Sequence, residues 1–303
     1  MTVRDDVQTL AGRCGICPRR CGVDRSGGER GVCGVPSEFT VSRIALHPWE
    51  EPPISGTRGS GTVFFAGCNL RCVFCQNRTI SREGVGSVIS EDDLIRRMLT
   101  LQEEGAHNIN LVTPTHYTDS LVRLLTKLKP RLHIPVVWNS SGYESVESLR
   151  MLEGLVDVYL PDFKYMSPEL AAAYSAAPDY PTVATAAVRE MYRQTGPITF
   201  DGEGIARKGV IVRHLVLPGC RKDSIAVLRH LASILPISDI RVSVMRQYTP
   251  DFAMDCPHKN LHRRVTEFEY DSVLTQADEL GIVGYRQGKD AAQRAYTPEF
   301  GKL

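Results

Sequence analysis

The segment GSGTVFFAGCNLRCVFCQN at residues 59–77 decides the fold of this chain. It begins with a short β-rich apolar run, passes through a glycine, and then places Cys68, Cys72 and Cys75 within eight positions. The spacing C-x3-C-x2-C offers three thiolates, which can bind three irons of a cubane cluster and leave the fourth iron open to a small molecule. A structural zinc site generally closes with four ligands, and here the fourth would have to come from a distant strand. The spacing therefore favours a 4Fe-4S cluster over zinc.

Beyond the cysteine loop, β-rich apolar runs alternate with amphipathic helical patterns. Strands are expected at 62–67, 109–113, 135–139, 156–163, 210–218 and 240–245. Helices are expected between them, at 91–105, 118–129, 145–155, 168–195 and 223–235. This alternation predicts an α/β fold with a parallel sheet that is covered by helices and curls toward an incomplete barrel. Functional side chains should gather where the strands end.

The composition is that of a globular protein in which the cysteines come early. The chain has 303 residues, 42% of them hydrophobic, and its 36 Lys and Arg almost balance its 35 Asp and Glu. This balance gives no electrostatic reason to expect nucleic acid or a membrane as a partner. The first ten residues hold no apolar segment of signal-peptide length, so a cytoplasmic location is expected. Nine cysteines, seven of them before position 76, indicate metal ligation rather than a secreted disulfide framework.

Three regions are expected along the chain. Residues 1–55 are rich in Cys, Gly, Arg and Pro and lack apolar periodicity, which predicts a small module held together by a metal. Residues 56–250 carry the alternating pattern and should form the barrel. Residues 251–303 contain one further helical pattern and are expected to pack on the barrel as an extension.

The predicted N-terminal module has a cysteine set of its own. Cys14, Cys17, Cys21 and Cys33 follow the spacing C-x2-C-x3-C-x11-C, and four thiolates can close a tetrahedral site. Such a set suits structural zinc and a second Fe-S cluster equally well in ligand number. Because ligand identity alone does not select the metal, both metals stay open at this site.

Six blocks of the sequence resemble a known family. In chain order they are EEPPISGTRGSGTVFFAGCNLRCVFCQN, NINLVTPTH, NSSGYE, VDVYLPDFKY, VRHLVLPG and SVMRQYTP. They resemble the pyruvate formate-lyase activating enzyme-like branch of the radical S-adenosylmethionine (SAM) superfamily, and within it an uncharacterised group. Together the blocks span most of residues 10–250.

This resemblance implies a partial (βα)6 TIM-like barrel whose cysteine loop holds a 4Fe-4S cluster, with SAM chelating the unique iron. One electron, expected from reduced flavodoxin or ferredoxin, would cleave SAM to a 5′-deoxyadenosyl radical that abstracts hydrogen from a substrate. The branch suggests a glycine of a glycyl-radical partner protein as that substrate. A small molecule or a peptide is the alternative, and a non-catalytic metal-binding or redox-sensing protein is a further one.

SAM contacts are expected at strand ends. The resembled proteins often contact the methionine amino group through a GGE-like segment after the second strand. Here that place reads VTPTH, with no acid, so backbone carbonyls and the hydroxyls of Thr113 or Thr115 are the expected acceptors. Asn139 and Ser140 follow the third strand, where a ribose contact and a plain polar turn are both open. Further cofactor contacts are expected at Phe74, Asn77 and Gln247, and for Gln247 a substrate contact and a role in closing the barrel are also open.

Charged residues interrupt the fourth and fifth apolar strands. Asp162 and Lys164 flank Phe163, and period-two geometry puts both on one face. Buried charges are costly unless they are paired or bind a ligand, so a structural ion pair and a SAM contact are both open. By resemblance Lys164 meets a SAM carboxylate or ribose oxygen, and Arg213 is a further SAM contact. His116 is kept as a candidate substrate-facing acid or base.

Overall fold

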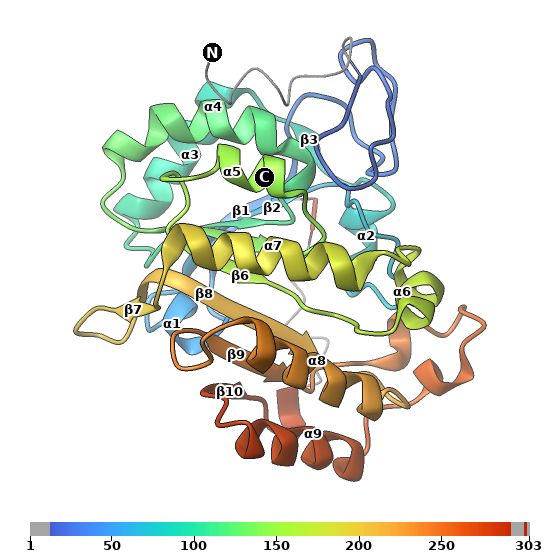
Figure 1. The fold of residues 1–303 in the computed structure, drawn as a ribbon. Helices are drawn as coiled ribbons and strands as arrows, with labels where there is room; N and C mark the ends of the chain where they lie inside the picture. The colour runs from blue at the N-terminus through green and yellow to red at the C-terminus, as the bar shows by residue number, and fades with distance from the viewer. Residues whose placement is uncertain (1–12, 292–299, 302–303) are drawn as a thin grey trace.

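The computed structural model describes residues 13–291 and 300–301 of the chain. Within those residues ten strands form one sheet in the order β10-β9-β8-β6-β5-β4-β2-β1-β3, with β7 paired to β8 (Figure 1). The strands are β1 (Thr40–His47), β2 (Ser60–Phe65), β3 (Ser87–Val88), β4 (Ile109–Val112), β5 (Val136–Ser140), β6 (Val158–Pro161), β7 (Thr199–Phe200), β8 (Ala206–Leu215), β9 (Arg241–Met245) and β10 (Gly284–Arg286).

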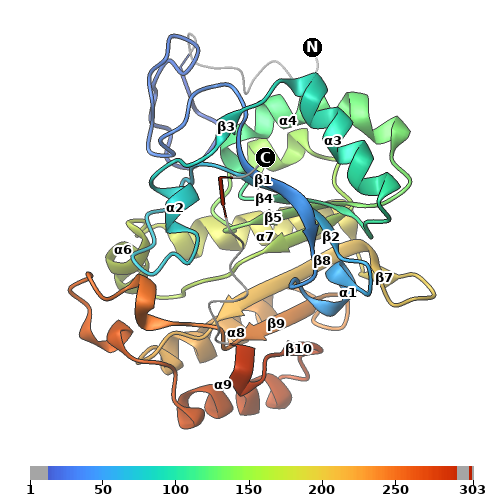
Figure 2. The same ribbon diagram turned by 180° about the vertical axis from the view of Figure 1, so that it is seen from behind.

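The helices are α1 (Pro52–Ser55), α2 (Arg78–Ser81), α3 (Glu91–Glu103), α4 (Thr118–Leu128), α5 (Val146–Met151), α6 (Pro168–Ser175), α7 (Tyr180–Thr195), α8 (Arg221–Ile234) and α9 (Glu267–Glu279). Apolar periodicity predicts α3, α4, α5, α8 and α9. The region 168–195 holds two helices, α6 and α7, and the short helices α1 and α2 were not predicted. Ser90 caps α3 by accepting a hydrogen bond from the Asp93 backbone N–H, which satisfies one of the free donors at a helix start. In Figure 1, α7 crosses in front of β6, and in Figure 2, seen from behind, it lies beyond the strands.

The predicted α/β fold with a partial TIM-like barrel is confirmed. The six expected strands are β2, β4, β5, β6, β8 and β9, and each pairs in parallel with the next. Four strands extend this set beyond the prediction, and one of them, β7, pairs with β8 in antiparallel fashion. The strand β10 adds a parallel neighbour to β9, while β1 and β3 join at the other edge in antiparallel fashion. The strand β1 lies inside the 1–55 range predicted for the metal module, and β10 inside the 251–303 extension.

A short helix closes the N-terminal end of the barrel. The helix α1 starts at Pro52, whose fixed φ and missing N–H suit the first helical turn. Its Ile54 is fully buried against apolar side chains from β5, β6 and β8, namely Val137, Val158, Leu160, Ala206 and Ile211. This apolar layer seals one end of the barrel, so polar side chains above it can line a cavity that opens toward the cysteine loop.

None of the helices in the described ranges is long and apolar enough to cross a membrane.

Candidate active site

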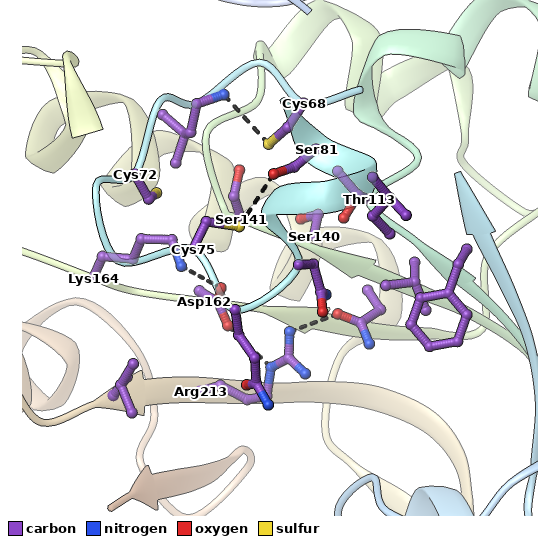
Figure 3. A pocket seen from close by; sticks show the side chains of 18 of the residues that line it. Cys68, Cys72, Cys75, Ser81, Thr113, Ser140, Ser141, Asp162, Lys164 and Arg213 are labelled. Carbon is purple, nitrogen blue, oxygen red and sulfur yellow. Dashed lines mark hydrogen bonds and ion pairs between the residues drawn. The ribbon is translucent and has the colours of Figure 1, made fainter. Parts of the chain in front are cut away.

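A cavity of about 260 Å³ lies at the carboxyl ends of the parallel strands, under the cysteine loop (Figure 3). Most of the residues predicted from the sequence line it together. These are Cys68, Cys72, Phe74, Cys75, Asn77, Thr113, Asn139, Ser140, Asp162, Lys164, Arg213 and Gln247. They come from loops and strands far apart in the chain, and the parallel sheet brings them to one place.

The three cysteines of the loop after β2 each have a hydrogen-bonding neighbour. The Leu70 backbone N–H donates to Cys68 Sγ at 3.4 Å. Hydroxyl groups lie 3.0 Å from Cys72 Sγ and 3.2 Å from Cys75 Sγ, and they belong to Ser175 and Ser81 respectively. Burial raises the pKa of Cys68 to about 12 and also raises the pKa of Cys75. Bound iron would therefore favour the thiolate forms of Cys68 and Cys75.

The loop fits a cluster better than a single ion. In the described part of the chain, no three Cys, His, Asp or Glu side chains are placed to hold one metal ion. In a cubane each cysteine binds a different iron, so sulfurs spread around one cavity are what a cluster requires. The neighbouring hydroxyls and the Leu70 N–H can donate to thiolate sulfur. The donor set thus fits a 4Fe-4S cluster.

A chain of charged side chains runs down the cavity wall. Lys164 Nζ lies 2.5 Å from Asp162 Oδ2, and Arg213 Nε lies 3.0 Å from Asp162 Oδ1. Burial alone would raise the pKa of Asp162, but Lys164 and Arg213 outweigh it and the pKa is lowered. Burial works against the charge of Lys164 as well, and Asp162 reverses that effect so that the pKa of Lys164 is raised. Both groups are therefore ionised near neutral pH.

Glu50 completes this chain and was not predicted. Its carboxylate accepts hydrogen bonds from Asn110 at 3.1 Å and Asn139 at 3.2 Å, and Arg213 Nη1 lies 3.4 Å away. Burial raises the pKa of Glu50, and Arg213 opposes that shift. The sequence shows only two acids before Pro52, inside a turn-like stretch. No local pattern places such a residue inside a barrel, because only the path from β1 into α1 brings it there.

The segment after β4 carries three predicted residues, of which only Thr113 lines the cavity. Thr113 lines the cavity and has a left-handed φ of 58°, which is uncommon outside glycine. Thr115 does not line the cavity, since it is buried and donates to Glu144 at 3.0 Å. His116 is also outside the lining; its Nε2 lies 2.8 Å from the Ala66 carbonyl, and burial lowers its pKa to about 3.

The turn after β5 offers a polar group to a ligand. Ser140 donates to Glu144 at 3.0 Å, whereas the Ser141 hydroxyl is buried at the cavity wall and has no hydrogen-bond partner among residues 13–291 and 300–301. Gly142 has a φ of 72°, and a side chain there would collide with the Asp162 carbonyl. The turn therefore needs glycine at this position. A buried hydroxyl without a partner is a suitable contact for a bound polar molecule.

His214, near the end of β8, and Tyr248, after β9, each hydrogen-bond to a backbone carbonyl of the protein. His214 is buried with Nδ1 2.7 Å from the Phe163 carbonyl, as expected for an interior histidine. Tyr248 donates to the Leu261 carbonyl at 2.5 Å and does not line the cavity, whereas Gln247 does.

The N-terminal cysteines lie directly beside the cavity loop. Burial raises the pKa of Cys17 to about 11, and the nearby thiols of Cys14, Cys33 and Cys21 add to the shift. The Cys68 backbone N–H donates to the Cys33 carbonyl at 3.3 Å. All nine cysteines are free thiols. In Figures 1 and 2 these N-terminal loops, drawn in blue, lie on the same side of the molecule as α2 and α6.

Comparison with known proteins agrees with this arrangement. A family model described as the Radical SAM superfamily matches residues 62–200. Uncharacterized protein MJ0674 of Methanocaldococcus jannaschii is 31% identical over 283 residues, which cover 89% of this chain and 75% of that protein.

Two solved structures have the same fold. A radical SAM methyltransferase from Sphaerobacter thermophilus superimposes with a TM-score of 0.50 at 15% identity, over 75% of this chain and 66% of that one. A cysteine-to-alanine mutant of spore photoproduct lyase gives a TM-score of 0.50 at 11% identity, over 74% of each chain. At such identities the likeness establishes the fold and leaves the substrate open.

Proposed function

We propose that this chain, of which residues 62–200 match the Radical SAM superfamily, cleaves SAM reductively and uses the resulting radical to abstract hydrogen from a substrate. One observation carries the proposal. Three partly buried thiols and the chain formed by Lys164, Asp162 and Arg213 line the same cavity. The presence of charged groups opposite a cluster-binding loop is explained if they bind a polar cofactor.

The residues divide the work in this proposal. Cys68, Cys72 and Cys75 would hold the 4Fe-4S cluster, which when bound supplies the electron that cleaves SAM to methionine and a 5′-deoxyadenosyl radical. Lys164 has three N–H donors, and Asp162 is its acceptor among the described residues, so it can also bind a SAM carboxylate. Further SAM contacts are proposed at Phe74, Asn77, Thr113, Asn139, Ser140, Asp162, Arg213 and Gln247.

Thr115 was predicted as a direct contact as well. Its hydroxyl already donates to Glu144, and it lies behind the cavity wall. We propose that it acts indirectly, by fixing the turn that carries Thr113.

The target of the radical is the least defined part of the proposal. A glycine of a glycyl-radical partner protein follows from the resemblance of the sequence blocks, and modification of a peptide or small molecule is the second candidate. Two features support the second candidate. The segment after β4 has no acid where the resembled proteins often have one, and the chain has an additional N-terminal cysteine set. A low-potential donor such as reduced flavodoxin or ferredoxin, in the cytoplasm, would supply the electron.

We propose that the N-terminal cysteines bind a second metal centre, either an Fe-S cluster or zinc, and a single zinc ion would require the described thiols to move closer together. Cys14, Cys17, Cys21 and Cys33 supply four thiols. Such a centre would hold together a segment whose described part before β1 contains no helix or strand.

Replacing Lys164 with methionine tests whether the cavity binds SAM. The variant loses a charge-assisted hydrogen bond worth about 1.5–3 kcal/mol, so the Kd for SAM should rise roughly 10- to 100-fold. Isothermal titration of anaerobic, cluster-loaded protein measures this change. Lys222→Met, at an exposed position on α8, is the matched control and should bind SAM as the unmodified protein does. An unchanged Kd in Lys164→Met would remove Lys164 from the SAM site.

A further inference from the structure

Among the described residues, the outer edge of β1 is only partly paired. On one side β1 pairs with β2 from Val41 to His47, and on the other β3 pairs only with Thr40 and Val41. Within the described ranges no strand pairs with that second edge beyond Val41. Exposed strand edges present backbone donors and acceptors that an extended peptide can use.

Gly301, in the last segment of the chain that the structure describes, already makes such a backbone contact. The Gly301 backbone N–H donates to the Ser42 carbonyl at 3.1 Å, at the point where the register between β1 and β2 shifts. In Figure 2 the end of the chain, in dark red, lies next to β1. A peptide backbone therefore fits along this edge.

Phe300 adds a side-chain contact to that backbone bond. Its ring packs against Phe64, Ile80 and Val112, which are buried and form a small apolar cluster. The Phe64 and Phe300 ring centroids lie 5.5 Å apart at an interplanar angle of 66°, an edge-to-face geometry. All three partners of Phe300 also line the cavity under the cysteine loop. The contact thus lies at the boundary of the candidate active site.

The apolar cluster is part of the cavity wall. Because Phe64, Ile80 and Val112 line the cavity and also contact Phe300, a segment bound against them lies beside the candidate SAM site.

We propose that the edge of β1 at Ser42, together with Phe64, Ile80 and Val112, binds an extended peptide segment of the substrate. The segment would present an aromatic or large aliphatic side chain to the apolar cluster and backbone hydrogen bonds to β1. In the substrate-free chain, Phe300 and Gly301 occupy this site. This inference rests on the proposed function and specifies its substrate as a peptide segment.

Fluorescence anisotropy with a labelled peptide tests the inference. The probe is TPEFGKL, the sequence of residues 297–303, and its matched control is TPEAGKL, which lacks the aromatic ring. A tethered segment competes at an effective concentration in the millimolar range, so the full-length protein should bind the probe weakly. Full-length Phe300→Ala should bind it at least about tenfold more tightly, because its own tail has lost its anchor. Phe268→Ala, exposed on α9, should behave as the unmodified protein does.

Every result of this experiment either supports the peptide site or overturns it. Tighter binding in Phe300→Ala, seen with TPEFGKL and not with TPEAGKL, supports the peptide site. Equal binding by Phe300→Ala and unmodified protein, equal binding of the two peptides, or no binding at all overturns it. Release of 5′-deoxyadenosine is measured on the same preparations. Peptide binding without this product defeats the proposed function alone, and the product without peptide binding defeats the peptide site alone.

Discussion

Arg213→Met is expected to lower the free energy of unfolding by about 3–5 kcal/mol. The Arg213 guanidinium lies 3.0 Å from Asp162 and 3.4 Å from Glu50, and it donates to Asn139 at 2.5 Å. These side chains are mostly buried, with 15% of Arg213, 17% of Asp162 and 10% of Glu50 exposed. Removing one partner of a buried charge network leaves the others insufficiently compensated, which costs more than the loss of a surface pair.

Urea unfolding of the full chain measures this effect through the change in midpoint. Arg229→Met is the matched control, because Arg229 is exposed on α8 and donates to a neutral partner, Gln276, at 2.9 Å. It should change stability by less than about 1 kcal/mol. A loss of similar size in the two variants would contradict a central role for the Arg213 network.

The stability difference should also depend on pH. The pKa of Asp162 is lowered in the folded protein, because Lys164 and Arg213 outweigh burial. The stabilisation that they give is therefore present above the unfolded pKa of Asp, about 3.9, and is lost as the pH falls through the folded value. The gap between Arg213→Met and the unmodified protein should narrow below about pH 4.

Cys72→Ala is expected to abolish cluster loading at the loop after β2. An unmodified chain should carry about four irons there after anaerobic reconstitution, and two remaining thiolates cannot hold a cubane in place. Iron, sulfide and zinc analysis of the same samples measures the loss. Cys220→Ala is the matched control, since Cys220 is a buried thiol whose pKa burial raises to about 11. Full iron content in Cys72→Ala would contradict the assignment of the loop as the cluster site.

The same metal analysis identifies the N-terminal centre. In Cys17→Ala, a loss of zinc with the loop iron retained would assign structural zinc to the N-terminal cysteines. A loss of about four irons relative to the unmodified chain would assign a second cluster. No change in either metal would contradict a metal centre at that site.

The main elements of the fold could be predicted because local signals and tertiary structure agree. Each of the six buried parallel strands is a short apolar run between helical patterns, and each is found within a few residues of its expected place. The strand β1 was missed because it directly follows the Cys-, Gly- and Arg-rich residues 13–34 and was assigned with them to one metal-held module, although Val41, Ile44 and Leu46 give it an apolar character of its own. It is held by antiparallel pairing with β2, which is a contact between strands and not a property of its own sequence.

In the candidate site, too, residues placed by a local pattern could be predicted, and residues placed by contacts between distant segments could not. Asp162 and Lys164 were predicted to share a face, since alternation along a strand fixes where side chains point. Glu50 was missed because its contacts with Asn110, Asn139 and Arg213 join distant parts of the chain. Thr113 and Thr115 could not be separated by sequence, because the left-handed φ of Thr113 redirects the chain directly after β4.

Release of 5′-deoxyadenosine tests the central claim most directly. The full-length protein, reconstituted anaerobically with iron and sulfide, is incubated with SAM and dithionite, and the products are separated by liquid chromatography. We expect 5′-deoxyadenosine and methionine from the unmodified protein and from Cys220→Ala, and none from Cys72→Ala. Absence of 5′-deoxyadenosine from protein whose loop cluster is fully loaded and reduced would contradict SAM cleavage by this chain.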